Sequence, residues 1–593
     1  MTHTSTNGAP RARQVALLAA VAAALHGPAA AQQPAPAPPP TWAPVAPATF
    51  LRAHEGRIVD GTGRPVVLRG MGLGGWMLQE GYMLQAGGLQ QHVIRRKMTE
   101  LIGREATAAF YTAWLDNHTT KADIDALAAW GFNSVRLPMH YELFTPSVDD
   151  EPVPGRNTWK EDGFRRLDAL LAWCKANDIY LILDLHAAPG GQGNDLPIAD
   201  RDPAKPSLWE RAADQDKMVA LWAEIARRYK DEPSVGAYDL LNEPNWDLDG
   251  TGDAHGCKVR DNARLAALYR RATAAVRQAD RNHLVIIEGN CWGNNYAGVV
   301  PDWDANMALS FHRYWNRPGR ETIRDVLALR SRYGLPVWLG ESGENSNDWY
   351  AETVALVEGE GIGWAWWPHK KFGFSSPLQI HPDPGVRRVT AYWQGRGPKP
   401  SREEAHAALM RLATHDVRFE NNERHPDVIH ALVGAPGGPS GAPYTGHAIG
   451  PAGGRVLAAD YDMGRNGVAY FDRTAADYHV TDGGTWTKWN DGEVYRNDGV
   501  DLARDRGGPY VPSMDVGEWL RYTVTSPGGT YRLRLGDAAG AAADVSIRLN
   551  GDALPGGAAP TVTLLPGRNT LVVQARRAGV SLRALDFHPA PRQ

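Results

Sequence analysis

Apolar and polar positions alternate with two periods between residues 50 and about 430. Segments with apolar residues three and four positions apart predict amphipathic helices, and the short apolar runs between them predict buried strands. In one such unit Ile124, Leu127 and Ala128 share a helix face before the predicted strand 134–136. The same order of helix and strand recurs along the region, which is typical of βα units that form a parallel sheet.

Eight strands are predicted in this region. They cover residues 66–68, 134–136, 180–185, 235–241, 284–288, 307–311, 337–339 and 363–367. Eight βα units match a (β/α)8 barrel, which we place at residues 50–434. The last helix is expected to begin with a capping box formed by Ser401 and Glu404.

An open, doubly wound sheet is the alternative to a barrel. Such a sheet has a glycine-rich phosphate loop after its first strand, and Gly70–Gly75 superficially offers one. However, no helix start follows it in register, and no acidic residue closes the next strand. We therefore expect these glycines to relieve backbone crowding at the mouth of a barrel.

The N-terminal residues predict export. Residues 1–31 contain two arginines, an apolar run and then three alanines, which is the order of a secretory signal peptide. The Pro- and Ala-rich residues 32–49 predict an extended linker. No later run reaches the ~20 apolar residues of a membrane helix, so we expect a secreted protein, extracellular or periplasmic, without a membrane span.

The C-terminal residues predict a second domain. Residues 435–454 are rich in Gly and Pro and predict another linker. Beyond them the helical period disappears, and short alternating runs such as 519–524 and 531–535 are separated by Gly, Asn and Asp turns. We therefore expect a β-sandwich, of the jelly-roll kind, at residues 455–593.

Composition and charge limit the classes of molecule that the protein is expected to bind. A chain of 593 residues is too long for one core. A net charge of -4 and a pI of about 6.6 leave no basic stripe for a nucleic acid. The 21 Trp and 20 Tyr favour carbohydrate slightly, because such rings stack on sugars, although any single one is more often part of a core.

The three cysteines allow one disulfide at most. This number excludes a zinc cluster and a disulfide-dense scaffold. Cys174 occupies a core position of a predicted helix, whereas Cys257 and Cys291 lie in loops. We therefore favour a bridge between Cys257 and Cys291 over three buried thiols.

Polar residues that end the predicted strands are the candidates for chemistry, because a barrel enzyme has its active site at the C-terminal ends of its strands. These residues are Arg136, His186, Asn242, Glu243, His312, Tyr314, Glu341 and Trp367. Two glutamates there can flank a glycosidic bond, one protonating the leaving oxygen and the other attacking the anomeric carbon. A single glutamate after a strand is more often solvated or ion-paired, so the hypothesis depends on the whole set.

Taken together, these motifs resemble glycoside hydrolase family 5, the cellulase-like (β/α)8 family, over residues 50–429. The motif Leu-Leu-Asn-Glu-Pro implies that Glu243 is the acid/base and that Asn242 bonds the 2-hydroxyl of the sugar. The motif Trp-Leu-Gly-Glu-Ser implies that Glu341 is the nucleophile. The resemblance therefore implies a retaining β-glycosidase that works by double displacement.

The same resemblance assigns the supporting residues. Arg136 in Ser-Val-Arg-Leu-Pro would bond the nucleophile and hold it ionised. His186 in Asp-Leu-His matches a family motif, as do His312 and Tyr314 in Ser-Phe-His-Arg-Tyr, where the Tyr hydroxyl would donate to the nucleophile. Trp367 would be the aromatic platform for the sugar.

The substrate is less closely defined. Leu-Arg-Gly-Met-Gly-Leu-Gly-Gly-Trp and Leu-Asp-Leu-His-Ala-Ala-Pro-Gly-Gly-Gln look most like the exo-acting β-1,3-glucanase branch, which favours a β-1,3-glucan. His369 stands where that branch usually has an aromatic residue, so the outer sugar site is expected to differ. An endo-β-1,4-glucanase, a mannanase, a transglycosylase and a catalytically silent carbohydrate-binding protein remain alternatives.

Metal-dependent hydrolysis is a further alternative for His, Asp and Glu at strand ends. Such sites commonly have a His-x-His pair on the first strand, and residues 66–71 contain none. We therefore expect no metal or other cofactor in the barrel.

The C-terminal domain resembles carbohydrate-binding module family 6. The resemblance is carried by runs such as 495–501 and 517–520. That family often holds a structural calcium through an early glutamate. Ala459 stands at that place here, whereas Asp586 near the end could still serve as a ligand.

Overall fold

The computed structural model describes most of the chain. The described residues are 49–314, 316–434, 441–473, 489–490, 492–536, 543–556 and 559–590. The predicted signal peptide and all but the last residue of the first predicted linker lie outside them. Within the described ranges, no helix has both the length and the apolar character that a membrane crossing requires.

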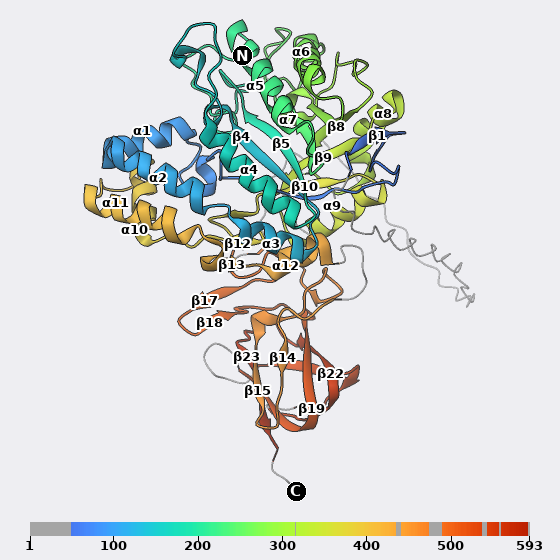
Figure 1. Ribbon diagram of the computed structural model, residues 1–593. Coiled ribbons are helices and arrows are strands. Elements are labelled where there is room, and N and C mark those ends of the chain that lie inside the picture. The colour runs from blue at the N-terminus through green and yellow to red at the C-terminus, as the bar shows by residue number, and fades with distance from the viewer. Residues whose placement is uncertain are drawn as a thin grey trace, which may run out of the picture. The chain divides into compact units, whose positions relative to one another are not determined.

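Eight parallel strands close into a barrel (Figure 1). They are β3 (Arg69–Gly72), β4 (Ser134–His140), β5 (Tyr180–Ala187), β6 (Val235–Asp239), β7 (Leu284–Glu288), β8 (Met307–His312), β9 (Val337–Gly343) and β10 (Trp364–Trp367). β10 pairs with β3, which completes the circle. The predicted (β/α)8 fold is therefore confirmed.

Helices alternate with these strands and surround them (Figure 1). They are α1 (Gln91–Ile102), α2 (Arg104–Asn117), α3 (Lys121–Trp130), α4 (Glu161–Ala176), α5 (Ala212–Tyr229), α6 (Ala263–Ala279), α7 (Asn290–Gly293), α8 (Arg324–Tyr333), α9 (Asn347–Gly359), α10 (Pro384–Trp393), α11 (Arg402–Arg411) and α12 (Pro426–Ile429). The predicted capping box opens α11: the Glu404 amide donates to Ser401 Oγ, and the Ser401 amide donates to the Glu404 carboxylate.

The first barrel strand lies further along the chain than predicted. Val66 and Leu68 precede β3 and pack with Leu51 and Ile58 in an apolar cluster at the amino ends of the barrel strands. This segment is also bonded to an earlier part of the chain, because the Val66 amide donates to the Ile58 carbonyl at 2.9 Å. The apolar run therefore closes the bottom of the barrel, and the small residues after it form the strand.

Glycines in and just after β3 make room for neighbouring groups, as the sequence predicted. A Cβ on Gly70 would lie 2.8 Å from Ser134 Oγ. A Cβ on Gly72 would lie 2.5 Å from Trp367 Cε3, and one on Gly74 would lie 2.8 Å from Trp367 Cζ2. Gly72 and Gly74 thus leave the space that the Trp367 ring occupies.

The C-terminal domain is rich in antiparallel strands. Its sheet has the order β15 (Gly454–Leu457), β23 (Ala584–Pro589), β19 (Trp519–Gly536), β22 (Thr561–Ala575), β20 (Val545–Leu549) and β21 (Asp552–Ala553), and β14 (His447–Ala448) and β16 (Tyr470–Phe471) also pair with β19. This sheet has its own apolar core, which includes Ile449, Val456 and Tyr522. The predicted β-rich domain after the barrel is confirmed.

The second predicted linker is shorter than expected. β14 lies within residues 435–454 and pairs with β19, and Ile449 beside it is buried in the core of the sheet. Residues 435–440 lie outside the described residues. Burial of the apolar Ile449 is the reason why the later part of this Gly- and Pro-rich segment belongs to the sheet.

Shorter strands lie outside the two main sheets. They are β1 (Arg52–His54), β2 (Arg57–Val59), β11 (Lys370–Lys371), β12 (Leu378–Gln379), β13 (Glu423–Arg424), β17 (Ala503–Asp505) and β18 (Gly508–Tyr510). The predicted disulfide between Cys257 and Cys291 is present, and Cys174 is a buried free thiol.

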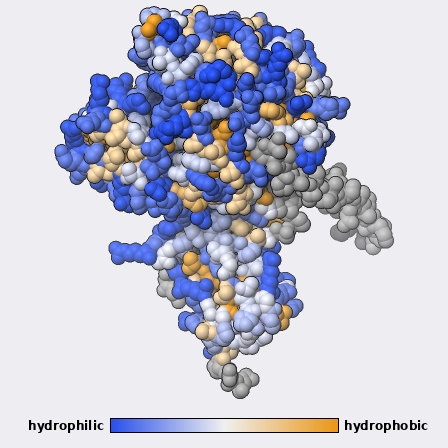
Figure 2. All heavy atoms as spheres, in the orientation of Figure 1, coloured by the Kyte–Doolittle hydropathy of each residue, from blue (hydrophilic) through white to orange (hydrophobic). Residues whose placement is uncertain are grey.

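Hydrophilic residues predominate on the molecular face in Figure 2, and apolar residues are scattered over it. The exposed large apolar side chains among the described residues are Tyr82, Val153, Val300, Phe471, Val516 and Leu565. Most of them are far apart in the sequence, and single exposed apolar residues of this kind are ordinary. Tyr82 differs because it lines the cavity at the mouth of the barrel.

Replacing Gly72 should disturb the packing under Trp367. The added methyl of Gly72→Ala cannot fit at 2.5 Å from the ring, so we expect a loss of about 1–3 kcal/mol in the free energy of unfolding, measured in urea. Gly359→Ala is the matched control, because a Cβ there has no neighbour within 4 Å. Equal unfolding midpoints for the two variants would contradict the role assigned to Gly72.

Candidate active site

A cavity of about 710 Å³ opens at the carboxyl ends of the barrel strands. Its lining contains six of the eight residues that the sequence singled out, namely His186, Glu243, His312, Tyr314, Glu341 and Trp367. The other two, Arg136 and Asn242, are completely buried and contact these residues from behind. All eight therefore belong to one site.

Glu341 near the end of β9 is held by two donors. Arg136 Nη1 donates to its Oε2 at 2.8 Å, and the Tyr314 hydroxyl donates to its Oε1 at 2.5 Å. Its negative charge therefore faces a guanidinium on one side and a phenol on the other. The remaining directions around the carboxylate are open to the cavity.

Arg136 on β4 shares its single positive charge among several carboxylates. Its nitrogens lie 3.2 Å from Asp184, 2.9 Å from Asp239, 3.0 Å from Glu288 and 2.8 Å from Glu341. Burial acts to lower the pKa of Arg136, but these neighbouring charges outweigh it and raise the pKa well above its ordinary value. The guanidinium thus stays charged inside the barrel and fixes the positions of the acids around it.

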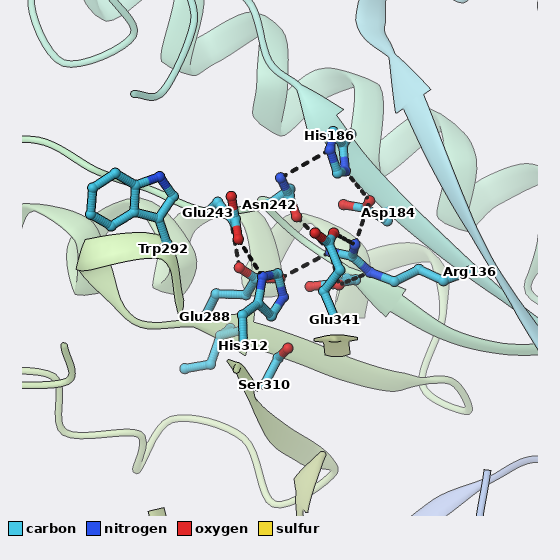
Figure 3. Close-up of polar contacts among 12 residues, drawn as sticks. Arg136, Asp184, His186, Asn242, Glu243, Glu288, Trp292, Ser310, His312 and Glu341 are labelled. Atoms are coloured by element: carbon cyan, nitrogen blue, oxygen red, sulfur yellow. Dashed lines mark hydrogen bonds and ion pairs between the residues drawn. The ribbon is translucent and has the colours of Figure 1, made fainter. Parts of the chain in front are cut away.

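Glu243 has a different environment from Glu341. Its Oε1 lies 2.6 Å from His312 Nδ1, and its backbone amide donates to Glu288 Oε2 at 2.7 Å (Figure 3). The residue has a left-handed φ of 43°, which is strained for a side chain with a Cβ. Burial, with the charge of Glu341 added, raises the pKa of Glu243 to about 7, although the hydrogen bond with His312 opposes the rise.

The two glutamates are close together. Oxygen atoms of Glu243 and Glu341 lie within 4.8 Å of one another, and a nitrogen of His312 lies within the same distance of both. A separation of about 5 Å between carboxyl groups is that of glycosidases that retain the anomeric configuration. Inverting enzymes need a wider gap because a water molecule must fit beside the sugar.

The same three residues could formally converge on a cation, but their chemistry does not suit one. Burial acts to lower the pKa of His312, yet the charge of Glu288 and hydrogen bonds with Glu243 and Glu288 raise it well above its ordinary value. A protonated imidazole has no lone pair for a metal. His312 is therefore better suited to bonding the carboxylate of Glu243 than to ligating an ion.

Asn242 and His186 form a chain of hydrogen bonds behind the cavity. Arg136 Nη2 donates to Asn242 Oδ1 at 2.8 Å, and Asn242 Nδ2 lies 3.2 Å from His186 Nε2. His186 Nδ1 lies 2.7 Å from Asp184 Oδ2. Burial lowers the pKa of His186 to about 3, so the neutral ring donates to Asp184 and accepts from the amide of Asn242.

Trp367 at the end of β10 forms one wall of the cavity. Its ring stacks on His186, with centroids 5.1 Å apart and planes 7° apart. Its Nε1 donates to the Tyr82 hydroxyl at 2.9 Å. The ring is therefore fixed at its face and at its edge, as a platform for a sugar requires.

Three buried acidic residues of the site, Glu288, Asp184 and Asp239, were not among the eight candidates predicted from the sequence. Glu288 ends β7, just as Glu341 lies near the end of β9, so the rule used for strand ends could have found it. Its Oε1 bonds Arg136 Nη2 and lies 3.2 Å from His312 Nε2. Asp184 interrupts the apolar strand β5 with a charge and Asp239 ends β6 within an apolar run of the sequence, which was the signal for an inward-facing acid.

Loop residues of the cavity were also missed, because no periodic pattern marks them. Trp292 lies in α7, where it and Cys291 both have left-handed φ values of 53° and 55°. The disulfide to Cys257 fixes this strained turn, and Trp292 Nε1 donates to Asp195 Oδ2 at 3.3 Å. In the view of Figure 3, Glu243 lies between Trp292 and Glu341.

His369 does not lie at the cavity, in contrast to the expectation that it would alter an outer sugar site. The side chain is buried, its ring centroid is 5.5 Å from that of His118, and its backbone amide donates to the Gly72 carbonyl. Its chain neighbour Lys370 pairs with the buried Asp123. This residue therefore belongs to the packing behind β10.

Comparison with known proteins shows which families and enzymes the barrel is similar to. Residues 97–373 match the model of the cellulase family, glycosyl hydrolase family 5. The chain is 28% identical over 371 residues to a β-xylosidase of Phanerodontia chrysosporium, a match that covers 56% of this chain and 73% of the relative.

Two further relatives are glucan-degrading enzymes by name. Endoglucanase C of Acetivibrio thermocellus is 24% identical over 321 residues, which are 44% of this chain and 86% of the relative. The probable glucan 1,3-beta-glucosidase A of Aspergillus niger is 28% identical over 186 residues, which are 30% of this chain and 41% of the relative.

His312 should set the proton affinity of Glu243. In His312→Gln the amide can still donate to Glu243, but the positive charge is gone, so the pKa of Glu243 should rise above about 7. The measurement is an NMR titration with glutamate labelled at the side-chain carboxyl carbon. His369→Gln removes another buried histidine, away from the cavity, and should leave the titration unchanged; a shift in both variants would contradict this role of His312.

Proposed function

We propose that this chain, an O-glycosyl hydrolase whose barrel is a glycosyl hydrolase family 5 domain, cleaves a β-linked glucan by double displacement with Glu341 as nucleophile and Glu243 as acid/base. The observation that carries the proposal is the pair of glutamates within 4.8 Å in one cavity with unlike partners. One faces a guanidinium and a phenol, and the other faces an imidazole.

In the first step Glu341 forms a bond to the anomeric carbon while the bond to the leaving oxygen breaks. Glu243 gives its proton to that oxygen, so the leaving group departs as a neutral alcohol. A pKa of about 7 lets Glu243 carry this proton near neutral pH. In the second step Glu243 takes a proton from water, and the resulting oxygen displaces Glu341 from the sugar with a second inversion.

The supporting residues have matching roles in this reaction. Arg136 and Tyr314 hold the attacking carboxylate between them. Asn242 has one amide hydrogen directed to His186 and a second that can bond the 2-hydroxyl of the sugar. Trp367 offers its ring to the apolar face of the sugar in the cavity.

A β-1,3-glucan is the favoured substrate. Support comes from the resemblance of the segments around residues 68–76 and 183–192 to exo-β-1,3-glucanases and from the name of the Aspergillus niger relative. β-Xylosides are the second candidate, because a relative that matches 56% of this chain is named a β-xylosidase.

We also propose that the enzyme is secreted and uses no metal cofactor. The predicted signal peptide and the Cys257–Cys291 disulfide both suit an oxidising compartment. Each proton and bond in the reaction above is handled by side chains of this chain. In the C-terminal domain, Asp586 faces Arg455 at 3.6 Å and Ala459 offers no side-chain ligand, so we do not assign a calcium ion there. Carbohydrate binding by that domain remains a prediction.

Removing the nucleophile tests the proposed reaction. Glu341→Gln should lower kcat/KM by at least about 10³-fold, because the covalent step is lost. The assay is release of reducing sugar from laminarin, cellulose, mannan and a β-xyloside. Glu100→Gln, an exposed change on α1, should match wild type. If wild type is as inactive as Glu341→Gln on every substrate, the proposal is overturned, and a catalytically silent binding protein is favoured.

The stereochemistry of the product tests the distance between the two glutamates. With a separation of this size the first product should be the β anomer, detected by proton NMR before mutarotation. An α anomer at the earliest times would indicate inversion. A product that grows with added sugar acceptor instead of free reducing sugar would identify a transglycosylase that uses the same two steps.

A further inference from the structure

The segment of residues 342–346 ends β9 and leads into α9, and it has two sides with different neighbours. It follows Glu341 directly. On one side Glu344 lines the cavity and pairs with Lys371 Nζ at 2.8 Å. On the other side Asn345 and the first residues of α9 are buried and contact Asn466 and Asn497 of the C-terminal domain.

Asn497 bonds several residues at this junction. Its Nδ2 donates to the Asn345 carbonyl at 2.8 Å, and its own carbonyl accepts from the Asn347 amide at 2.7 Å. Its backbone amide donates to Asp427 Oδ2 in α12 at 2.8 Å. The side chain is completely buried, so these bonds are protected from competition by water.

A buried charge pair supports Asn497. Asp427 Oδ2 also accepts from Asn347 Nδ2 at 2.7 Å and lies 3.7 Å from Arg496 Nε. Arg496 is completely buried between the rings of Tyr444 and Tyr461, at 4.4 and 4.0 Å from their centroids. Removing one member of such a network leaves polar groups without partners, which is costly.

A second set of contacts holds the start of α9. The Asp348 carboxylate accepts from the Asn466 amide at 3.2 Å and from the Tyr470 hydroxyl at 3.2 Å. One turn later Glu352 pairs with Arg465. The first turn of the helix that follows the proposed nucleophile is therefore bonded along its length to the C-terminal domain.

The segment has little freedom to adjust if these contacts are lost. Glu344 has a left-handed φ of 57°. A Cβ on Gly343 would lie 2.2 Å from the Trp367 carbonyl, so the chain passes directly against the sugar platform. Any movement of residues 343–347 is therefore transmitted to Glu341, Glu344 and Trp367.

We propose that the C-terminal domain is part of the catalytic unit and that Asn497 is a positioning residue for the segment that carries Glu341 and Glu344. The inference rests on the proposed function for the role of Glu341. It differs from the expectation of a module tethered by a flexible linker. A tethered module raises the local concentration of a polymer but leaves the cleavage of a small soluble substrate unchanged.

The test compares Asn497→Ala with Asn569→Ala on a small soluble aryl β-glycoside that the wild type cleaves. Asn569 is a matched control, because it is similarly buried in the same domain, and among the described residues its side chain bonds only β22 and Asn550. We expect kcat to fall roughly 10–100-fold for Asn497→Ala, with KM nearly unchanged, since small displacements of reacting groups have effects of this size. Asn569→Ala should keep the wild-type kcat.

Hydrogen exchange provides a readout that does not depend on activity. The comparison is made at a temperature where wild type and both variants are folded. There the backbone amides of residues 342–350 should exchange faster in Asn497→Ala than in wild type, and at the wild-type rate in Asn569→Ala. If Asn497→Ala has the same kcat and the same exchange rates as wild type, the inference is overturned. Equal losses of kcat in both variants would also overturn it. If the wild type cleaves no glycoside, the proposed function fails, and the exchange data alone decide whether Asn497 holds the segment.

Discussion

The buried charge of Arg136 is the constraint on which the rest of the site depends. A guanidinium without water is tolerated only if acids surround it, and here Asp184, Asp239, Glu288 and Glu341 do so. These five residues come from five different barrel strands. The charge therefore requires a closed barrel in which those strands have the right register, and the same requirement brings the proposed nucleophile to the mouth of the cavity.

Two glutamates with oxygen atoms within 4.8 Å of each other can have opposite roles because their surroundings differ. Glu341 faces a permanent cation and a hydroxyl donor. Glu243 is buried beside an imidazole, and its pKa is raised to about 7. Glu288 connects the two halves, since it bonds both Arg136 and the backbone of Glu243. A change at Glu288 would therefore be felt by both glutamates.

Most of the barrel, and the convergence of the eight candidate residues at one end of it, could be predicted because strand ends carry a local signal, namely a polar residue after an apolar run. The position of the first strand along the chain could not be predicted. Val66 and Leu68 would be apolar both in a barrel strand and in the cluster that closes the bottom of the barrel. The position of Trp292 could not be predicted from periodicity either, because it depends on two residues with left-handed backbone conformation and on a disulfide.

The C-terminal domain shows the same limit at a larger scale. The run around Arg496 and Asn497 resembles part of a binding module, and local sequence does not tell a polar cluster that faces solvent from one buried at an internal junction. Its burial has a consequence for the proposed nucleophile. Two buried guanidinium groups lie near the strand and helix that flank it. Arg136 bonds Glu341 directly, whereas Arg496 pairs with Asp498 at 2.9 Å and lies 3.7 Å from Asp427, which bonds Asn347. Because Arg496 belongs to the C-terminal domain, we infer that the geometry of the cavity depends on both domains.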